Sequence, residues 1–434
     1  STLVADPIDH LAAALPIKAK TSQGYWIRVW IPEDAISGNY SSDVLIKNNH
    51  EVIGKLKLTV QVQQRTLPQP DQWAFHLDLW QNPYAVARYY GVEPFSDKHF
   101  ELMRPLMKLY ADAGGKVITV PIMHHPWGGQ TYDPYETMIT WVRKIDGSWW
   151  FDYTIFDKWV EFMMDMGVKK EIGCYSMIPW KLSFLYFDQA TNSMKELKSK
   201  PGEQAYHDLW LSMLKDFAAH LKSKGWFDIT HIAMDERPMP DMLKALKIIR
   251  EADPDFKVSL AGSLHKELSD ELNDYCIAIA EKFSEEMKTK RKAEGKITTY
   301  YTCCAESHPN TYTFSNPAEG AWIAWYAAKE NLDGYLRWAL NSWTIEPLLD
   351  SRFYTWGAGD TYLLYPGGRT CLRFENLVAG IQAYEKIRIL KTELQTQNKT
   401  ATLRKLERVL ESFDELQLLK TPANVVVEKA NLFI

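Results

Sequence analysis

ITHIAMDERP, at residues 229–238, is a short apolar run that ends in two adjacent carboxylates and a proline. Runs of four to eight such residues that stop at turn signals are typical of buried strands. Residues 205–222 and 242–251, on either side of it, carry the three- and four-residue apolar spacing of helices. The stretch therefore has the pattern of one strand–helix unit of a parallel sheet.

The same pattern recurs along the chain from about residue 73. We expect strands at residues 73–79, 116–123, 171–177, 230–234, 256–261, 275–279, 297–303 and 334–342. Eight such units favour a (β/α)8 barrel over an open doubly wound sheet. No GxGxxG or Walker motif follows any of the runs, so the usual cofactor signature of the open sheet is missing. We predict an α/β protein with a TIM-like barrel over residues 69–395 and no cofactor.

Both ends of the chain differ from this pattern. Residues 25–31, 39–46 and 55–62 have the composition and alternation of antiparallel strands, so we expect residues 1–68 to be part of a β-sandwich, truncated at its start. In the tail, residues 396–434, apolar residues spaced by three or four from Leu403 to Leu416 predict an amphipathic helix that packs on the barrel. The run Asn424-Val425-Val426-Val427 predicts a final strand.

Composition and charge exclude several classes of protein. The chain has 434 residues, of which 46% are hydrophobic and 24% charged, as expected for a globular protein with a large core. The net charge of -5 and the scattered Lys and Arg residues offer no basic surface, so nucleic acid is not an expected partner. No run of 18 apolar residues predicts a transmembrane segment. Five cysteines without CxxC spacing indicate neither a disulfide framework nor a zinc site.

Asp235 and Glu236 are the strongest catalytic candidates, because a barrel of this type carries its chemistry at the carboxyl ends of its strands. Two neighbouring carboxyl groups can divide the work between a charged group and a protonated acid. The alternative is a helix-capping aspartate beside a solvated glutamate. Neighbouring residues of a strand point to opposite faces, so both can enter one pocket only if the chain curls after the strand.

The last predicted strand supplies further candidates. One of its faces carries Tyr335, Arg337, Ala339, Asn341 and Trp343. We expect this face to line the barrel interior, so that Arg337, Asn341 and Trp343 point at the site, while Trp338 packs against the helices. The alternatives are a core-filling role for Trp343 and a buried ion pair for Arg337.

Two other motifs have residue types that occur in metal sites or as nucleophiles. His124 and His125 suggest a metal site, but adjacent histidines at a strand end diverge and neither HExxH nor a set of carboxylate ligands accompanies them, so we expect no metal. A structural or substrate-binding role is favoured for these histidines. Cys303 and Cys304 suggest a thiol nucleophile, yet buried thiols are common and no oxyanion motif is present.

Four segments together resemble glycoside hydrolase family 123, the bacterial exo-acting β-N-acetylgalactosaminidases. They are the pair Asp235-Glu236, residues 301–304 (YTCC), residues 334–343 (GYLRWALNSW) and residues 359–367 (GDTYLLYPG). The resemblance covers about residues 25–390. It implies an N-terminal β-sandwich, a (β/α)8 barrel and retaining, substrate-assisted hydrolysis of terminal β-linked GalNAc on glycans or glycolipids.

The resemblance also implies roles for single residues. Asp235 would orient the substrate acetamide and Glu236 would act as general acid and base. Tyr301 would place a hydroxyl near the acetamide and Trp343 an apolar wall under the sugar. The candidates for the sugar hydroxyls are His124, Arg337, Asn341, Asp360 and Tyr365. An enzyme of external glycans is expected in the periplasm or secreted, with its export signal absent from this chain.

Two other functions remain open at this point. One is a carbohydrate-binding barrel without turnover, and the other is a conventional retaining glycosidase that acts on sugars without an acetamido group.

Overall fold

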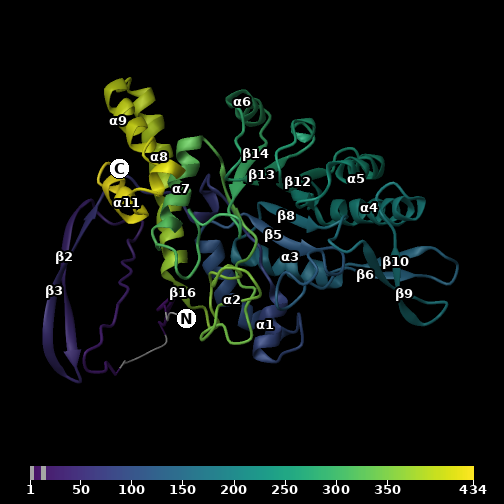
Figure 1. The fold of residues 1–434 in the computed structure, drawn as a ribbon, viewed down its shortest axis with the longest axis horizontal. Helices are drawn as coiled ribbons and strands as arrows, with labels where there is room; N and C mark the ends of the chain where they lie inside the picture. The colour runs from purple at the N-terminus through teal and green to yellow at the C-terminus, as the bar shows by residue number, and fades with distance from the viewer. Residues whose placement is uncertain (1–3, 11–15) are drawn as a thin grey trace. The chain divides into compact units, whose positions relative to one another are not determined.

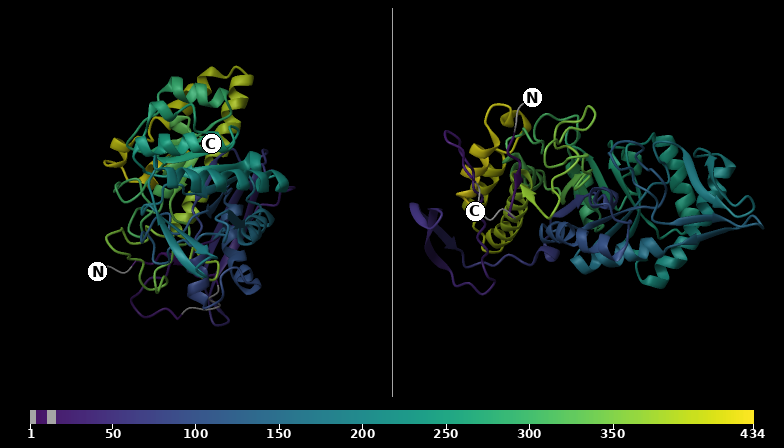
Figure 2. Two further views of the ribbon diagram at one scale, coloured as in Figure 1. Left: turned by 90° about the vertical axis from the view of Figure 1, so that its right-hand side faces the viewer. Right: turned by 90° about the horizontal axis from the view of Figure 1, so that it is seen from below.

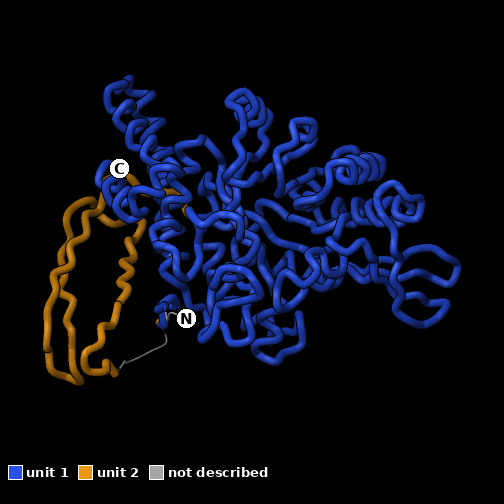
Figure 3. Tube along the Cα trace, in the orientation of Figure 1, with its two compact units in different colours: residues 1–9, 70–434 blue, residues 10–69 orange. Residues whose placement is uncertain are grey.

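The computed structural model describes residues 4–10 and 16–434, which form two compact units (Figure 3). Residues 1–9 and 70–434 make up the first, called the barrel unit here, and residues 10–69 make up the second, called the hairpin unit. Parts of the predicted sandwich, at residues 1–3 and 11–15, lie outside the described residues.

Eight parallel strands form the centre of the barrel unit, in an order that follows the chain (Figure 1). They are β4 (His76–Leu79), β5 (Val117–Pro121), β8 (Glu171–Tyr175), β11 (Thr230–Met234), β12 (Lys257–Gly262), β13 (Asp274–Ala278), β14 (Ile297–Tyr301) and β15 (Gly334–Arg337). β15 pairs with β4, and an isolated bridge between Leu77 and Gly115 joins β4 to the residues just before β5. The sheet is thus a nearly closed (β/α)8 barrel, and all eight predicted strands are confirmed.

Helices follow most of the strands and flank the sheet (Figure 1). They are α1 (Pro83–Tyr90), α2 (Asp97–Asp112), α3 (Thr154–Met166), α4 (Gln204–Lys224), α5 (Met239–Ala252), α6 (Glu285–Ala293), α7 (Glu319–Glu330) and α8 (Leu372–Thr396). Helices α4 and α5 confirm the predicted helical segments. Local sequence sets the ends of α1: the Asn82 side chain accepts from two backbone amides and Pro83 stands in the first turn, while Gly91 ends the helix with a φ of 64°.

A cluster of buried charged side chains fills the amino-terminal end of the barrel. Nε2 of His76 lies 3.1 Å from Oδ2 of Asp274, and Nδ1 of His231 lies 3.0 Å from Oε1 of Glu171. These residues stand at or next to the first positions of β4, β13, β11 and β8. Pairing offsets the cost of burying their charges.

A smaller sheet and a short strand pair complete the barrel unit. The connections after β5 and β8 form a four-stranded sheet of β6 (Thr140–Arg143), β7 (Trp149–Asp152), β9 (Ser183–Asp188) and β10 (Ser193–Lys198). β1 (Pro7–Ile8) pairs with β16 (Thr370–Cys371), and the buried Asp6 carboxylate accepts from Nε and Nη2 of Arg373 at 2.9 and 2.6 Å. The start of the chain therefore belongs to the barrel unit, which differs from the predicted boundary at residue 68.

The described part of the hairpin unit contains two antiparallel strands, β2 (Gly38–Asn48) and β3 (Glu51–Val62), with Tyr40 opposite Val60. They confirm the predicted strands at residues 39–46 and 55–62. The strand predicted at residues 25–31 is wrong, because this segment is irregular and its side chains are exposed. Alternation produces a strand only where another strand supplies backbone hydrogen bonds, and none pairs with this segment in the described part of the unit.

The C-terminal tail is helical throughout its regular part. It contains α9 (Thr400–Leu410), α10 (Glu415–Leu418) and α11 (Ala423–Asn431), at one end of the barrel unit (yellow in Figure 2). Phe413, between α9 and α10, stacks on Trp325 of α7 with ring centres 4.8 Å apart, so the predicted packing on the barrel is confirmed although the helix is interrupted. The predicted strand at residues 424–427 is wrong. Val426, Val427 and Ala430 are buried at the spacing of a helix face.

None of the helices in the described ranges has the length and apolarity needed to cross a bilayer.

Candidate active site

A pocket of about 140 Å³ lies at the carboxyl ends of the barrel strands. It is lined by Trp80, Trp127, Gln130, Trp180, Asp235, Glu236, Ala261, Tyr301, Cys303, Cys304, Leu336, Trp338 and Trp356. Five of these residues are tryptophans, which offer flat apolar faces, and two are the predicted carboxylates. A pocket of this composition can hold a sugar ring beside an acid or base.

Asp235 and Glu236 both reach the pocket because β11 ends at Met234, one residue before them. The chain bends at Glu236, so the two side chains are not bound by the alternation of the strand. The curl that the sequence required is therefore present.

The Asp235 carboxylate is buried, with 6% of the residue exposed, and it is held by two donors. Nε1 of Trp180 donates to Oδ2 at 2.8 Å, and Nε of Arg237 donates to Oδ1 at 3.0 Å. Burial raises the pKa of Asp235 above its usual value, although the Arg237 cation and the Trp180 hydrogen bond oppose this shift. Arg237 also lies over the Trp180 ring, 5.2 Å from its centre. These contacts fix the orientation of the carboxylate.

Glu236 differs from its neighbour in being exposed. Its Oε1 accepts a hydrogen bond from the phenol of Tyr301, the last residue of β14. The structure therefore brings the predicted residue Tyr301 into the pocket, with its hydroxyl on one of the two candidate catalytic carboxylates.

Stacked indoles form one wall of the pocket. Trp80 follows β4 and stacks on Trp127 with ring centres 4.5 Å apart. Trp338 faces Trp356 edge-on at 6.5 Å, and Nε1 of Trp356 donates to the backbone oxygen of Gln130 at 3.1 Å. Segments that follow different strands are thus joined around the pocket.

The prediction of which face of strand eight (β15 and the residues after it) points into the barrel is wrong. Leu336 and Trp338 line the pocket, and Leu336 packs with Ala233 and Tyr301 inside the barrel. Tyr335 contacts Tyr300 on the other side of the sheet, where Tyr300 donates to the backbone of α7. Alternation was inferred correctly, but the face that carries Arg337 points away from the site.

Five predicted substrate contacts lie behind the pocket and do not line it. Nη2 of Arg337 lies 2.6 Å from Oδ1 of Asp360, and both side chains are 0% exposed, so this is the buried ion pair considered as the alternative. Asn341 exchanges two hydrogen bonds of 2.9 Å with the backbone of Asn82. Trp343 is a core residue that donates to the backbone oxygen of Leu364 at 2.7 Å, and Tyr365 donates to Asp6.

The Cys303 thiol lines the pocket, but burial raises its pKa to about 12. A thiol that stays protonated near neutral pH is a poor nucleophile.

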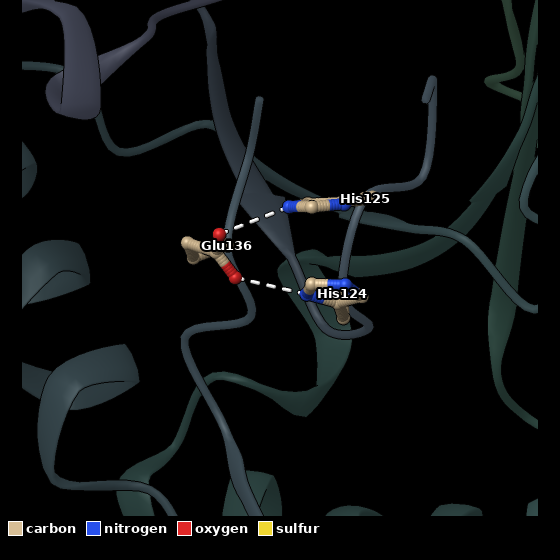
Figure 4. Close-up of side chains that lie close together, drawn as sticks. All are labelled: His124, His125 and Glu136. Carbon is tan, nitrogen blue, oxygen red and sulfur yellow. Dashed lines mark hydrogen bonds and ion pairs between the residues drawn. The ribbon is translucent and has the colours of Figure 1, made fainter. Parts of the chain in front are cut away.

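Among the residues that the structure describes, two groups of side chains have the composition of metal ligands. His124, His125 and Glu136 lie together on the loop between β5 and β6 (Figure 4), and His76, Glu171 and Asp274 belong to the buried cluster.

The sequence did not predict four residues of the site, Arg237, Trp80, Gln130 and Trp338. Position in the sequence could have indicated two of them, since Arg237 follows Glu236 directly and Trp80 is the first residue after β4.

Comparison with known proteins identifies the family of the chain. The model of the glycoside hydrolase 123 catalytic domain matches residues 80–390, and the model of the glycoside hydrolase 123 N-terminal domain matches residues 1–48. The chain is a glycoside hydrolase. It belongs to glycoside hydrolase family 123. A search of curated proteins found no match.

A solved structure of a family 123 glycoside hydrolase from Clostridium perfringens, from a study of glycolipid glycan hydrolysis, is similar to the chain. It has a TM-score of 0.84 and 29% identity, over 93% of this chain and 76% of that chain. A xylanase from Thermobacillus composti has 12% identity and a TM-score of 0.35, over 71% of this chain and 97% of that one. An α-L-fucosidase from Lactobacillus casei has 12% identity and a TM-score of 0.33, over 74% and 98%.

Proposed function

We propose that the chain is a retaining exo-β-N-acetylgalactosaminidase that releases terminal β-linked GalNAc from glycans or glycolipids by substrate-assisted catalysis. The observation that carries the proposal is the presence of two consecutive carboxyl groups in one pocket, with Asp235 buried and Glu236 exposed. A conventional retaining pair stands roughly 5–5.5 Å apart on opposite sides of the scissile bond. Two residues that follow one strand suit an acid/base beside a group that orients a nucleophile within the substrate.

In the first step, the acetamido oxygen of the substrate forms a bond to the anomeric carbon as the glycosidic bond breaks. Glu236 gives its proton to the leaving oxygen, and the sugar becomes an oxazolinium ion. Asp235 accepts a hydrogen bond from the acetamide N–H, and its carboxylate is held in orientation by Trp180 and Arg237. In the second step, Glu236 takes a proton from water as its oxygen attacks the anomeric carbon. The bond from that carbon to the acetamido oxygen breaks, which restores the acetamide with net retention.

The exposure of the two carboxyl groups supports this division of roles. Glu236 is accessible to the aglycone and to water, both of which exchange protons with the acid/base. Asp235 is covered on the side of Trp180, where a carboxylate interacts more strongly with a developing positive charge than it would in water.

The size of the pocket favours the binding of a single terminal sugar. Its volume of about 140 Å³ is below the range of roughly 300–1,000 Å³ typical of larger ligands. Gln130 contributes an uncharged amide to the lining and is our candidate for the axial O4 of galactosamine. The related enzyme from Clostridium perfringens, studied for glycolipid glycan hydrolysis, supports the substrate class.

A panel of aryl β-glycosides tests the proposal. We expect turnover of the GalNAc glycoside, less of the GlcNAc glycoside and none of the galactoside. Stepwise fluorination of the acetyl group should slow turnover, because it weakens the attacking oxygen. Turnover of the galactoside at the rate of the GalNAc glycoside would indicate a conventional glycosidase, and binding of GalNAc without any turnover would indicate a carbohydrate-binding barrel.

Two variants test the assigned roles. Glu236→Gln and Asp235→Asn should each lower kcat/KM for the GalNAc glycoside by about 10²-fold or more. Glu251→Gln, which alters an exposed glutamate on α5, is the matched control and should leave kcat/KM unchanged. Full activity in both site variants would refute the proposal.

We also propose a periplasmic or secreted location, because the proposed substrates are external glycans. Cell fractionation of the native bacterium with an antibody against the chain tests this location, and recovery only from the cytoplasm would contradict it.

A further inference from the structure

Two adjacent histidines and a glutamate face one another on the loop between β5 and β6, residues 122–139 (Figure 4). Nδ1 of His124 lies 2.9 Å from Oε2 of Glu136, and Nε2 of His125 lies 2.9 Å from Oε1 of the same carboxylate. One carboxylate therefore contacts two imidazoles with its two oxygens. His124 and His125 come from the first arm of the loop and Glu136 from the returning arm.

The backbone brings the two imidazoles together, against the divergence expected for neighbours on a strand. His125 has a φ of 50°, in the left-handed region, and the two rings stack with centres 3.5 Å apart and planes at 24°. A non-glycine residue in this region costs about 1–3 kcal/mol and persists only where the surroundings hold it. The arrangement is thus a built feature of the loop.

Contacts outside the triad hold both arms of the loop. The backbone N–H of His125 donates to the oxygen of Tyr135 at 2.9 Å, and the backbone oxygen of His125 accepts from Gly128 at 3.1 Å. On the returning arm, the Tyr84 hydroxyl donates to the backbone oxygen of Glu136 at 2.7 Å. The three side chains are consequently preorganised.

We propose that His124, His125 and Glu136 form a binding site for a divalent transition-metal ion such as Zn²⁺. Their ligand atoms all lie within 4.8 Å of one another, and tetrahedral zinc with ligand bonds of 2.0–2.1 Å needs them about 3.4 Å apart. Only small side-chain movements are therefore required. Two imidazole nitrogens and one carboxylate favour zinc over magnesium or calcium, which prefer oxygen ligands.

The exposure of the triad suits a reversible site. The side chains of His124, His125 and Glu136 are 21%, 33% and 50% exposed, so an ion can enter and water can complete its coordination. The buried triad of His76, Glu171 and Asp274 is less suited to a cation, because the cavity that His76 lines also carries the positive charges of Lys116, Lys170, Lys292 and Lys296.

The ion would join the two arms of a loop that forms one wall of the active-site pocket. Trp127 and Gln130 of this loop line the pocket, and the backbone oxygen of Pro126 accepts from Trp180 at 2.9 Å. Trp180 in turn holds Asp235. Zinc at this triad is therefore a stabiliser of the sugar-binding wall and does not contact the reacting atoms.

Calorimetric titration of the metal-free protein with ZnCl₂ tests the proposal. We expect one ion per chain, and a Kd that rises by about 10-fold or more in His124→Ala, His125→Ala and Glu136→Gln. His207→Ala is the matched control, since His207 also contacts two carboxylates, Asp208 and Glu251. The Kd of this variant for zinc should equal that of the unchanged protein. Circular dichroism confirms that each variant is folded, and Glu136→Gln preserves the shape of the side chain.

Absence of saturable zinc binding would overturn the proposal, and so would an unchanged Kd in all three triad variants. Limited proteolysis supplies a second readout, because zinc should protect residues 122–139 in the unchanged protein and not in Glu136→Gln. Both measurements use zinc alone and no glycoside. Their outcome is thus independent of whether the pocket hydrolyses GalNAc.

Discussion

The phenol of Tyr301, at the end of β14, donates a hydrogen bond to Oε1 of Glu236, which follows β11. This contact spans the barrel and positions the exposed carboxyl group at the pocket. We expect Tyr301→Phe to lower kcat for an aryl β-GalNAc substrate by about 10-fold, because Glu236 loses its positioning contact. The free energy of unfolding should change by about 1 kcal/mol or less. Steady-state kinetics and urea unfolding measure the two effects, and an unchanged kcat would show that Tyr301 does not position Glu236.

The Arg237 cation opposes the rise in the pKa of Asp235 that burial causes. Arg237→Met should therefore raise this pKa further. Since Asp235 is expected to act as a carboxylate, the acidic limb of the kcat/KM profile should move to higher pH.

Arg352→Met is a matched control for this shift, because Arg352 pairs with Asp350 at the same two-residue spacing on an exposed loop. Its pH profile should coincide with that of the unchanged protein. A profile of Arg237→Met that also coincides would exclude Asp235 as the group that controls the acidic limb.

Trp338 and Trp343 should respond differently to truncation, because Trp338 lines the pocket and Trp343 fills the core. Trp338→Ala should lower kcat/KM by about 10-fold or more through the loss of an aromatic wall. Trp343→Ala should cost about 3–5 kcal/mol of stability and keep its kcat/KM per folded molecule at a permissive temperature. The reverse pattern would mean that Trp343 faces the sugar after all.

The stability of the barrel should fall at alkaline pH through His76. Burial opposes the charge on this ring, but Asp274, Glu171 and Asp78 outweigh burial and raise the pKa of His76 to about 9. Because the folded-state pKa exceeds the unfolded value of 6.5, the contribution is complete below pH 6.5 and is lost as the pH rises through 9. Urea unfolding between pH 6 and pH 10 measures this loss. His76→Gln should be less stable and should lose this part of the pH dependence, and an identical slope in both proteins would contradict the assignment.

The barrel and the two carboxyl groups of the pocket were predictable because they depend on local sequence. Each strand is a short apolar run, buried on both sides, and chain order alone determines the order of strands in such a barrel. Asp235 and Glu236 stand directly after the least ambiguous run, residues 230–234, which matches β11 residue for residue.

The orientation of strand eight could not be predicted, because alternation defines two faces without saying which is inside. Arg337 and Asn341 are polar and resemble site residues, yet they form hydrogen bonds with partners behind the pocket. The divergence expected of the His124 and His125 side chains was wrong for another reason. The turn at His125 and the return of Glu136 eleven residues later are properties of the folded loop. The helix at residues 423–431 was missed because valine favours strands, whereas burial at helical spacing decided the outcome.

The pairing of Asp6 with Arg373 affects how the catalytic domain can be expressed separately. The hairpin unit leaves the barrel unit after residue 9 and rejoins it at residue 70, so it is an insertion with both ends fixed in one body. A fragment that begins at residue 70 would contain every barrel strand yet leave the Arg373 guanidinium buried without its anion, at a cost of about 3–5 kcal/mol. The catalytic domain is therefore best isolated by shortening residues 10–69 to a linker, with the preceding segment kept because its Asp6 pairs with Arg373 and its strand β1 pairs with β16.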